Sequence, residues 1–110
     1  MIIIEFERHA PESCPMGNEK ALKAQMAYVA KLPEFGKKYG VKMISGWVLH
    51  SQHLGIYAFE APSMDFIQEF EREPEVMAWR CFTTVDYQMA VSIQDAQKRI
   101  AAKAIAVQAK

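Results

Sequence analysis

Net charge, cysteine and long apolar runs are all scarce in this sequence. Thirteen basic residues balance thirteen acidic ones, so no surface for nucleic acid or an anionic membrane is predicted. No apolar run approaches the roughly 20 residues that cross a bilayer. The opening MIIIEFERH lacks the cationic segment of a signal peptide. We therefore expect a cytoplasmic protein that binds neither nucleic acid nor a membrane.

Cysteine occurs twice, as Cys14 and Cys81. In a cytoplasmic protein two such residues are more typical of free thiols than of a structural disulfide. The chain also lacks paired C-x-x-C spacing, a Gly-rich phosphate loop, a dinucleotide fingerprint and a nucleophile elbow. These absences exclude a strong zinc motif and argue against nucleotide chemistry.

What remains is a chain of 110 residues, 51% of them hydrophobic, which has the size and composition of one soluble domain. We assign residues 1–110 to that domain, with a core over 1–92 and a C-terminal helix over 93–108. A chain this short buries only about 60–70% of its unfolded surface, so it often gains further burial by pairing with another chain.

Four segments have the β-branched and aromatic composition of strands. The second and third are joined by the short connector SQH, which predicts a hairpin. The predicted strands are residues 2–8, 41–50, 54–61 and 81–92.

The first predicted helix follows the first strand and its loop. Asn18 is a suitable N-cap and Gly40 a suitable C-terminal stop. Pro33 is expected to interrupt this helix or to restart it as a short turn. Apolar residues at helical spacing are expected to form its buried stripe, namely Leu22, Met26, Val29 and Leu32.

Two further helical regions are predicted. Ser63 can cap a helix before the fourth strand, and Pro74 can open another helical turn there. Ser92, with Asp95 three residues later, resembles a capping box that starts the C-terminal helix. The helix that Ser63 caps is expected to bury Phe66, Ile67 and Phe70, and the turn that Pro74 opens carries Val76, Met77 and Trp79. The stripe of the C-terminal helix consists of Ile93, Ala96, Ile100, Ala104 and Val107.

The order β-α-β-β-α-β plus one helix indicates an α+β, ferredoxin-like fold with an antiparallel four-stranded sheet. With the strands numbered in chain order, the expected spatial order is 4-1-3-2. Helices cover one face of such a sheet, but the predicted hairpin is apolar on both faces. Because a large exposed apolar sheet is typical of an interface, we expect a homodimer that pairs sheet faces. The C-terminal helix is a candidate strap on the partner.

The stretch GVKMISGWVLHSQHLGIYAFEAPSMDFIQEF, residues 40–70, resembles small proteins of the dimeric α/β-barrel superfamily. The features that carry the resemblance are Gly40, Val41, Lys42, Gly46, Trp47, Glu60 and Ala61. The superfamily includes muconolactone-isomerase-like enzymes, cofactor-independent monooxygenases, haem-binding members and proteins with no known activity. The resemblance therefore implies a fold and a dimer, and it transfers no catalytic residue.

The predicted topology gathers every histidine and cysteine at one end of the sheet. His9 and Cys14 follow the first strand, while His50, His53 and Cys81 lie near the ends of the others. The metal-ligand candidates are His9, Cys14, His50 and Cys81, for zinc, copper, iron or haem.

Three other interpretations of these residues stay open. Cys14 with His9 is a candidate nucleophile pair, and Cys14 with Cys81 a candidate redox switch. The third is purely structural: His50 and His53 are solvated hairpin residues, Cys81 fills the core, and the loop around Cys14 packs for stability.

A second candidate site lies along the first strand. Glu5, Glu7 and His9 alternate there and are candidates for general acid–base catalysis, because burial in an apolar dimer cavity raises a carboxyl pKa. Their expected companions in ligand binding are Trp47, Tyr57 and Tyr87. The competing interpretation pairs the glutamates with Lys42 or Arg8.

Three classes of function remain. The first is a small enzyme, isomerase-like or monooxygenase-like, that acts on a small apolar ligand in a sheet-lined cavity without an organic cofactor. The second is a metal- or haem-binding or sensing protein that uses the histidines and cysteines. The third is a structural or ligand-binding dimer without catalysis. The sequence does not decide between enzyme and non-enzyme.

Overall fold

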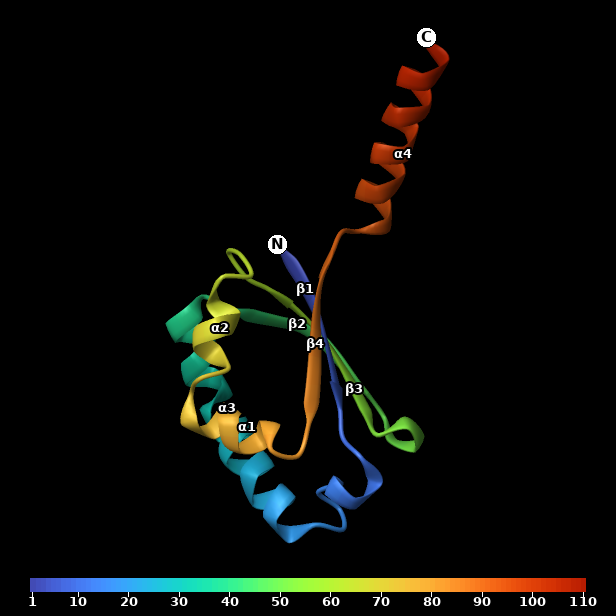
Figure 1. Cartoon of the computed structure of the whole chain (residues 1–110). Coiled ribbons are helices and arrows are strands. Elements are labelled where there is room, and N and C mark those ends of the chain that lie inside the picture. The colour runs from blue at the N-terminus through green and yellow to red at the C-terminus, as the bar shows by residue number, and fades with distance from the viewer.

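The computed structural model describes all 110 residues, and four of its segments form one antiparallel sheet with helices on one face (Figure 1). The strands are β1 (Ile2–Arg8), β2 (Lys42–Leu49), β3 (Leu54–Glu60) and β4 (Thr84–Ala90). The helices are α1 (Glu19–Tyr39), α2 (Phe66–Phe70), α3 (Pro74–Arg80) and α4 (Ile93–Gln108). The strand order β2-β3-β1-β4 confirms the predicted α+β, ferredoxin-like fold. None of the helices combines the length and apolar character needed to cross a membrane.

Both ends of α1 are where the sequence predicts them. The Ala21 amide donates to Asn18 Oδ1 at 3.0 Å, and Gly40 ends the helix in the left-handed conformation at φ 67°. The predicted break at Pro33 was wrong, because α1 continues through it. Phe35, two residues later, packs on Phe70 with ring centroids 5.7 Å apart, so tertiary packing holds the segment after the proline in the helix.

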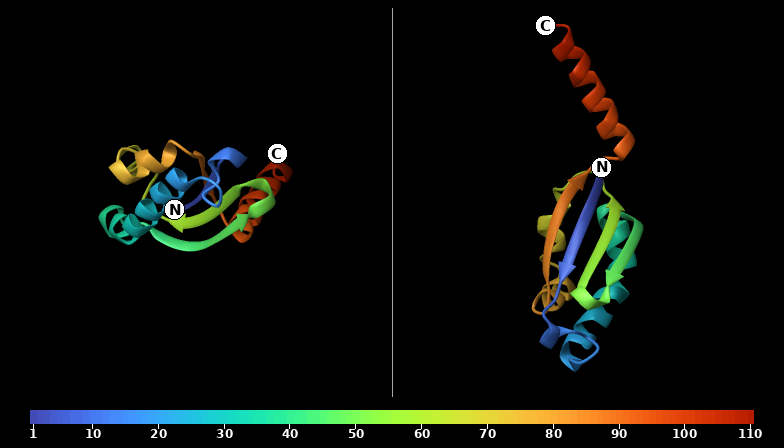
Figure 2. Two further views of the ribbon diagram at one scale, coloured as in Figure 1. Left: turned by 90° about the horizontal axis from the view of Figure 1, so that it is seen from below. Right: turned by 90° about the vertical axis from the view of Figure 1, so that its right-hand side faces the viewer.

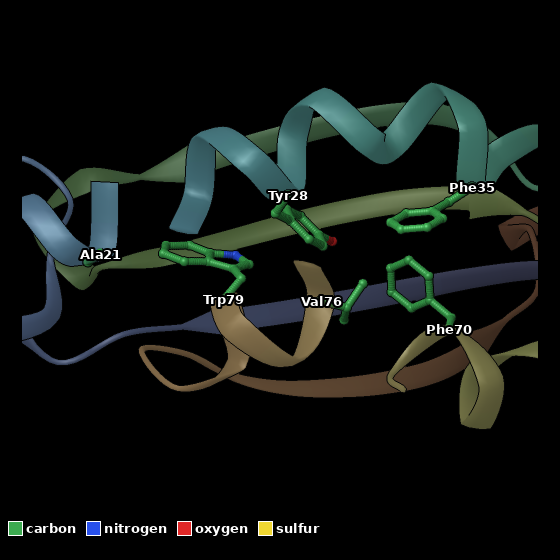
Figure 3. Packing of buried hydrophobic residues seen from close by; sticks show 6 residues of the cluster. All are labelled: Ala21, Tyr28, Phe35, Phe70, Val76 and Trp79. Atoms are coloured by element: carbon green, nitrogen blue, oxygen red, sulfur yellow. The ribbon is translucent and has the colours of Figure 1, made fainter. Parts of the chain in front are cut away.

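The buried face of α1 also differs from the predicted stripe. Leu22, Met26 and Val29 are exposed, and Leu32 is only partly buried. The residues that point to the core are Ala21, Tyr28 and Phe35, which recur every seven residues (Figure 3). Because apolar side chains occupy two adjoining faces of this helix, periodicity alone could not tell which of them would meet the rest of the chain.

The helices α2 and α3 supply the other half of this core. Phe70, Val76 and Trp79 face the side chains of α1, as Figure 3 shows. Ser63 Oγ accepts from the Asp65 amide at 3.1 Å, just ahead of α2 rather than as its N-cap. The first residues predicted for the fourth strand lie outside it: Cys81 is the C-cap of α3, and β4 begins only at Thr84.

The last helix projects away from the body of the molecule (Figures 1 and 2). Its start agrees with the prediction, since the Asp95 amide donates to Ser92 Oγ at 3.0 Å. No residue of α4 is buried. Its apolar stripe, predicted at positions such as Ile100 and Val107, is exposed in the single chain.

Candidate functional site

A cavity of about 230 Å³ lies between the sheet and the helices α1–α3. Thirteen of its 17 lining residues are hydrophobic, so an apolar ligand suits it. Tyr28 and Phe35 reach it from α1, and Tyr57 and Phe59 from β3. The cavity lies on the helix-covered face of the sheet. The sequence predicted a cavity on the open face, and that part of the prediction was wrong.

The register of the sheet places Glu5 and Glu7 in this cavity. Glu5 lies directly opposite Tyr57 on β3 and Tyr87 on β4. Residues directly opposite one another in antiparallel strands share a face, so these three form a row across the cavity floor. Both glutamates are buried and point toward the helices rather than toward the open face.

Tyr57 and Tyr87, two of the predicted ligand-binding residues, line the cavity, but Trp47 does not. Trp47 pairs with Ile56, which in turn pairs with Phe6. These residues occupy the open face of the sheet, where Trp47 is 55% exposed.

Two glycines make room for the ring of Tyr57. A Cβ on Gly55 would lie 2.5 Å from the Tyr57 hydroxyl, and one on Gly46 would lie 2.9 Å from its Cδ1. A Cβ atom essentially never makes a non-bonded contact this short. The ring therefore lies across backbone that carries no side chains, and this fixes the position of the Tyr57 hydroxyl beside the glutamates.

Arg80, at the end of α3, is the cation of the site. Its Nε donates to Glu71 Oε1 at 2.9 Å and its Nη1 donates to Glu7 Oε2 at 3.1 Å. Its Nη2 lies 3.8 Å from Glu5 Oε1. One guanidinium thus faces three carboxyl groups, which leaves an excess of negative charge when all three are ionised.

Neutral donors complete the network around Glu7 and Glu71. The indole Nε1 of Trp79 donates to Glu7 Oε2 at 3.0 Å, and the Tyr87 hydroxyl donates to Glu71 Oε2 at 2.7 Å. Glu7 and Glu71 each accept at least two hydrogen bonds when those from Arg80 are included. Glu5 has only the longer contact with Arg80 among the ion pairs, so it is the acid best placed to hold a proton.

The pKa of Glu5 is raised from 4.5 to about 7. Burial is the largest cause, and the charge of Glu7 adds to it, while Arg80 and Tyr87 partly oppose the rise. Burial, with the nearby glutamates, also raises the pKa of Tyr57 to about 12 and that of Tyr87 further. Near neutral pH the site therefore contains a carboxyl group that can accept or donate a proton, flanked by hydroxyl groups that keep theirs.

The histidines and cysteines gather at one end of the sheet, as the topology predicts. His9 Nε2 and His53 Nδ1 lie 3.0 Å apart, and Cys14 is close to both. Burial, followed by the charge of His53, lowers the pKa of His9. His9 does not line the apolar cavity, so the structure separates it from Glu5 and Glu7, its predicted catalytic companions.

The other two predicted metal ligands lie apart from this cluster. His50 is exposed in the 3₁₀ turn His50–Gln52 between β2 and β3. Cys81 is exposed, not buried in the core, and shares a surface hollow with His9. His53 takes the place that the sequence interpretation gave to His50.

Sequence reasoning missed Tyr28, which lines the cavity, and also Arg80 and Glu71, which form the polar network beside Glu5 and Glu7. Glu71 lies in the charged run EFEREPE, which reads as a solvated helix face. Only the fold brings this run against Tyr87. For His53 a signal did exist, because the antiparallel pairing of Arg8 with Leu54 places the next residues, His9 and His53, opposite each other.

Comparisons with known proteins were made for both sequence and structure. No family model and no curated protein matches the sequence. Among solved structures, the chain is similar to a "putative antibiotic biosynthesis monooxygenase" from Deinococcus radiodurans, with a TM-score of 0.53 and 13% identity. The match covers 84% of this chain and 94% of that one. The likeness is one of fold. It agrees with the ferredoxin-like fold, and it assigns no role to any residue.

Proposed function

We propose that this protein is an enzyme that removes a proton from a small apolar substrate, with Glu5 as the general base, in a monooxygenase-like or isomerase-like reaction. The observation that carries the proposal is a carboxyl group with a pKa near 7 in the wall of a largely hydrophobic cavity. Catalytic bases typically have a pKa close to the pH at which they work.

The size and lining of the cavity define the substrate class. A dry cavity of ~150 Å³ is enough to hold benzene, so about 230 Å³ suits one or two fused rings. Aromatic side chains such as Tyr28 and Phe35 provide ring-shaped contact surface. An aromatic or cyclic compound with one acidic C–H or O–H group fits this description.

The chemistry starts with transfer of a proton from the substrate to the Glu5 carboxylate, which leaves an anion in the cavity. Arg80 lies 3.8 Å from Glu5 and lowers the cost of that negative charge. In an isomerase-like reaction, Glu5 returns the proton to a different atom. In a monooxygenase-like reaction, the carbanion forms a bond to dioxygen and takes up a proton to give a hydroperoxide at the same carbon. Loss of water, with the remaining hydrogen of that carbon, breaks the O–O bond and leaves a carbonyl group, so the substrate itself supplies the electrons. The name of the structural neighbour from Deinococcus radiodurans supports the second version.

Proton abstraction can be tested without knowing the natural substrate. The fused-ring ketone 2-tetralone has acidic protons next to its carbonyl group, and their exchange in D₂O is followed by NMR. We expect the protein to accelerate this exchange. Because a general base typically contributes about 10²- to 10⁴-fold, Glu5→Gln should lose about 10²-fold or more of the acceleration.

The matched control is Glu60→Gln, which removes an exposed carboxyl group at the other end of the sheet and should leave the rate unchanged. Oxygen uptake measured on the same samples separates the two versions of the reaction. The proposal is wrong if the wild-type protein does not accelerate exchange, or if Glu5→Gln retains the wild-type rate.

A further inference from the structure

A second cluster of reactive side chains lies outside the apolar cavity, at the end of the sheet. His9, Cys14 and His53 each present one ligand atom there, and these atoms all lie within 4.8 Å of one another. The two histidine nitrogens are 3.0 Å apart. We propose that these three side chains bind a borderline-soft transition-metal ion of the Zn²⁺ class.

The backbone holds two of the ligands in place through the sheet. The His9 amide donates to the His53 carbonyl at 3.2 Å, which extends the pairing of β1 with β3 by one residue. His53 itself has a positive φ of 50°, the only such value among the non-glycine residues of the chain. A non-glycine residue in this conformation is strained and often marks a functional position.

Cys14 is placed by the loop that follows β1. Its amide donates to the Pro11 carbonyl at 3.2 Å, and its carbonyl accepts from the Gly17 amide at 3.0 Å. The side chain of Asn18 ties the loop to α1, since its Nδ2 donates to the Glu12 carbonyl at 3.1 Å. The thiol therefore lies on an ordered turn, and a metal would meet a donor set that already converges.

The donor set selects the class of ion. Imidazole nitrogen and thiolate sulfur are ligands for zinc and related ions, whereas magnesium and calcium prefer oxygen. Metal–ligand distances put the donors of tetrahedral zinc roughly 3.3–3.7 Å apart. The histidine nitrogens, 3.0 Å apart, are already near this spacing. The Cys14 sulfur lies within 4.8 Å of the histidine ligand atoms, so it has to approach them by about 1 Å at most. Three protein ligands leave the fourth position free for water or a small ligand.

The competing account is a plain hydrogen bond between two neutral imidazoles, with the thiol packed beside them. Titration with Co²⁺, a coloured substitute for Zn²⁺, separates the two accounts. We expect a near-ultraviolet charge-transfer band from a Co²⁺–thiolate bond and visible bands of a tetrahedral site. Addition of Zn²⁺ should remove both.

Variants with matched controls test the ligand set. Cys14→Ser should abolish the charge-transfer band. His53→Gln should weaken Co²⁺ binding by more than the roughly 10- to 100-fold typical of losing an outer-shell partner. The controls are Cys81→Ser and His50→Gln, which change the exposed residues of the same types and should bind Co²⁺ like the wild type.

A second measurement avoids altering the ligands. In the Cys81→Ser protein Cys14 is the only thiol, and Zn²⁺ should slow its alkylation by iodoacetamide while Mg²⁺ should not. In the Cys14→Ser protein the alkylation of Cys81 should be indifferent to Zn²⁺. The proposal is overturned if no thiolate band appears, if Cys14→Ser binds Co²⁺ like the wild type, or if Zn²⁺ leaves the alkylation of Cys14 unchanged.

Discussion

Glu5 is a residue whose burial costs folding free energy and at the same time gives it the pKa of a candidate base. It is 5% exposed, lies beside another carboxyl group, and has its closest cation, Arg80, engaged by Glu7 and Glu71. An ionised carboxylate in such a place costs free energy, so the proton is held more tightly than in water. Burial of the carboxyl group therefore makes Glu5 a candidate base and also lowers the stability of the folded state when Glu5 is ionised.

The raised pKa of Glu5 predicts that the stability of the protein depends on pH. The pKa of Glu5 rises from 4.5 to about 7 on folding, so between these values the folded state holds a proton that the unfolded state has lost. The stabilisation from this proton is full below about pH 4.5 and is lost as the pH rises through 7. At 1.36 kcal/mol per unit, the loss is on the order of 3 kcal/mol. The groups that face Glu5 are Glu7, Tyr28, Tyr57, Glu71, Arg80 and Tyr87.

The measurement is the free energy of unfolding in urea at several values between about pH 5 and pH 8. Glu5→Gln should become more stable relative to the wild type as the pH rises, because the amide does not ionise. Glu60→Gln serves again as the control with an exposed carboxyl group. A difference between Glu5→Gln and the wild type that stays constant across this range would contradict the raised pKa.

The sequence predicted Glu5 as a candidate acid or base but not the groups that tune it. Alternation along β1 places Glu5 and Glu7 on one face, and that is local information. Arg80 and Glu71 are more than 60 positions away in the chain, and they meet Glu5 only because α3 and the residue after α2 pack over the sheet. Alternation also could not show which face the helices would cover, so the cavity was expected on the wrong side.

At the scale of elements, the sequence predicted where helices begin and end, because their ends depend on local chemistry. It did not predict which face of a helix would be buried. Asn18, Gly40 and Ser92 act at the helix ends as their residue types predict, because a cap satisfies backbone groups within a few residues. The choice of Tyr28 and Phe35 over Leu22 and Met26 as the buried face of α1 depends on which surface meets α3. That choice is made by tertiary packing.

The packing of Tyr57 against the hairpin of β2 and β3 leads to a testable prediction. Gly55→Ala places a methyl group where the Tyr57 hydroxyl lies, 2.5 Å away, so the ring must tilt. Overpacking of this sort costs about 1–3 kcal/mol of stability, and the displaced hydroxyl should also weaken the binding of 2-tetralone. Thermal unfolding and a ligand titration measure the two effects.

Gly17→Ala is the matched control for this substitution, because a Cβ at Gly17 meets nothing within 4 Å. It should leave both ligand binding and the unfolding temperature close to the wild-type values. If Gly55→Ala changes stability and ligand binding no more than Gly17→Ala does, then Gly55 does not fix the position of the Tyr57 ring.

At the scale of the whole molecule, two apolar surfaces have no partner within the chain. One is the open face of the sheet, with Phe6, Ile56 and the exposed Trp47. The other is α4, which carries the exposed Ile100 and Val107 and extends the molecule to 62 Å (Figure 2). A helix of this length is marginal in water without packing.

A second copy of the chain is the partner that we propose for both surfaces. The 16 residues of α4 span about 24 Å, close to the roughly 23 Å length of a seven-residue strand. The helix of one copy can therefore cover the open face of the other, and a two-fold axis repeats the contact. Because the net charge of the chain is zero, two copies do not repel each other through their overall charge.

Light scattering and sedimentation of the full chain test this pairing. The wild type should be a dimer at micromolar concentration. Trp47→Glu and Ile100→Glu should each shift it toward the monomer, because they place a charge in the apolar contact. Met16→Glu, at a residue 93% exposed in the first loop, should not. A wild-type monomer at every concentration would rule the dimer out.

The residues that line the apolar cavity include members of all four strands and of α1–α3. They lie on the opposite face of the sheet from the one that we propose a second copy covers, so in that pairing each copy keeps a separate cavity. A ligand bound in one cavity then makes no direct contact with the other, so we expect the two cavities to bind the ligand with the same affinity. Saturation should follow a simple hyperbola, and any departure from it would have to be transmitted through the sheets from one chain to the other.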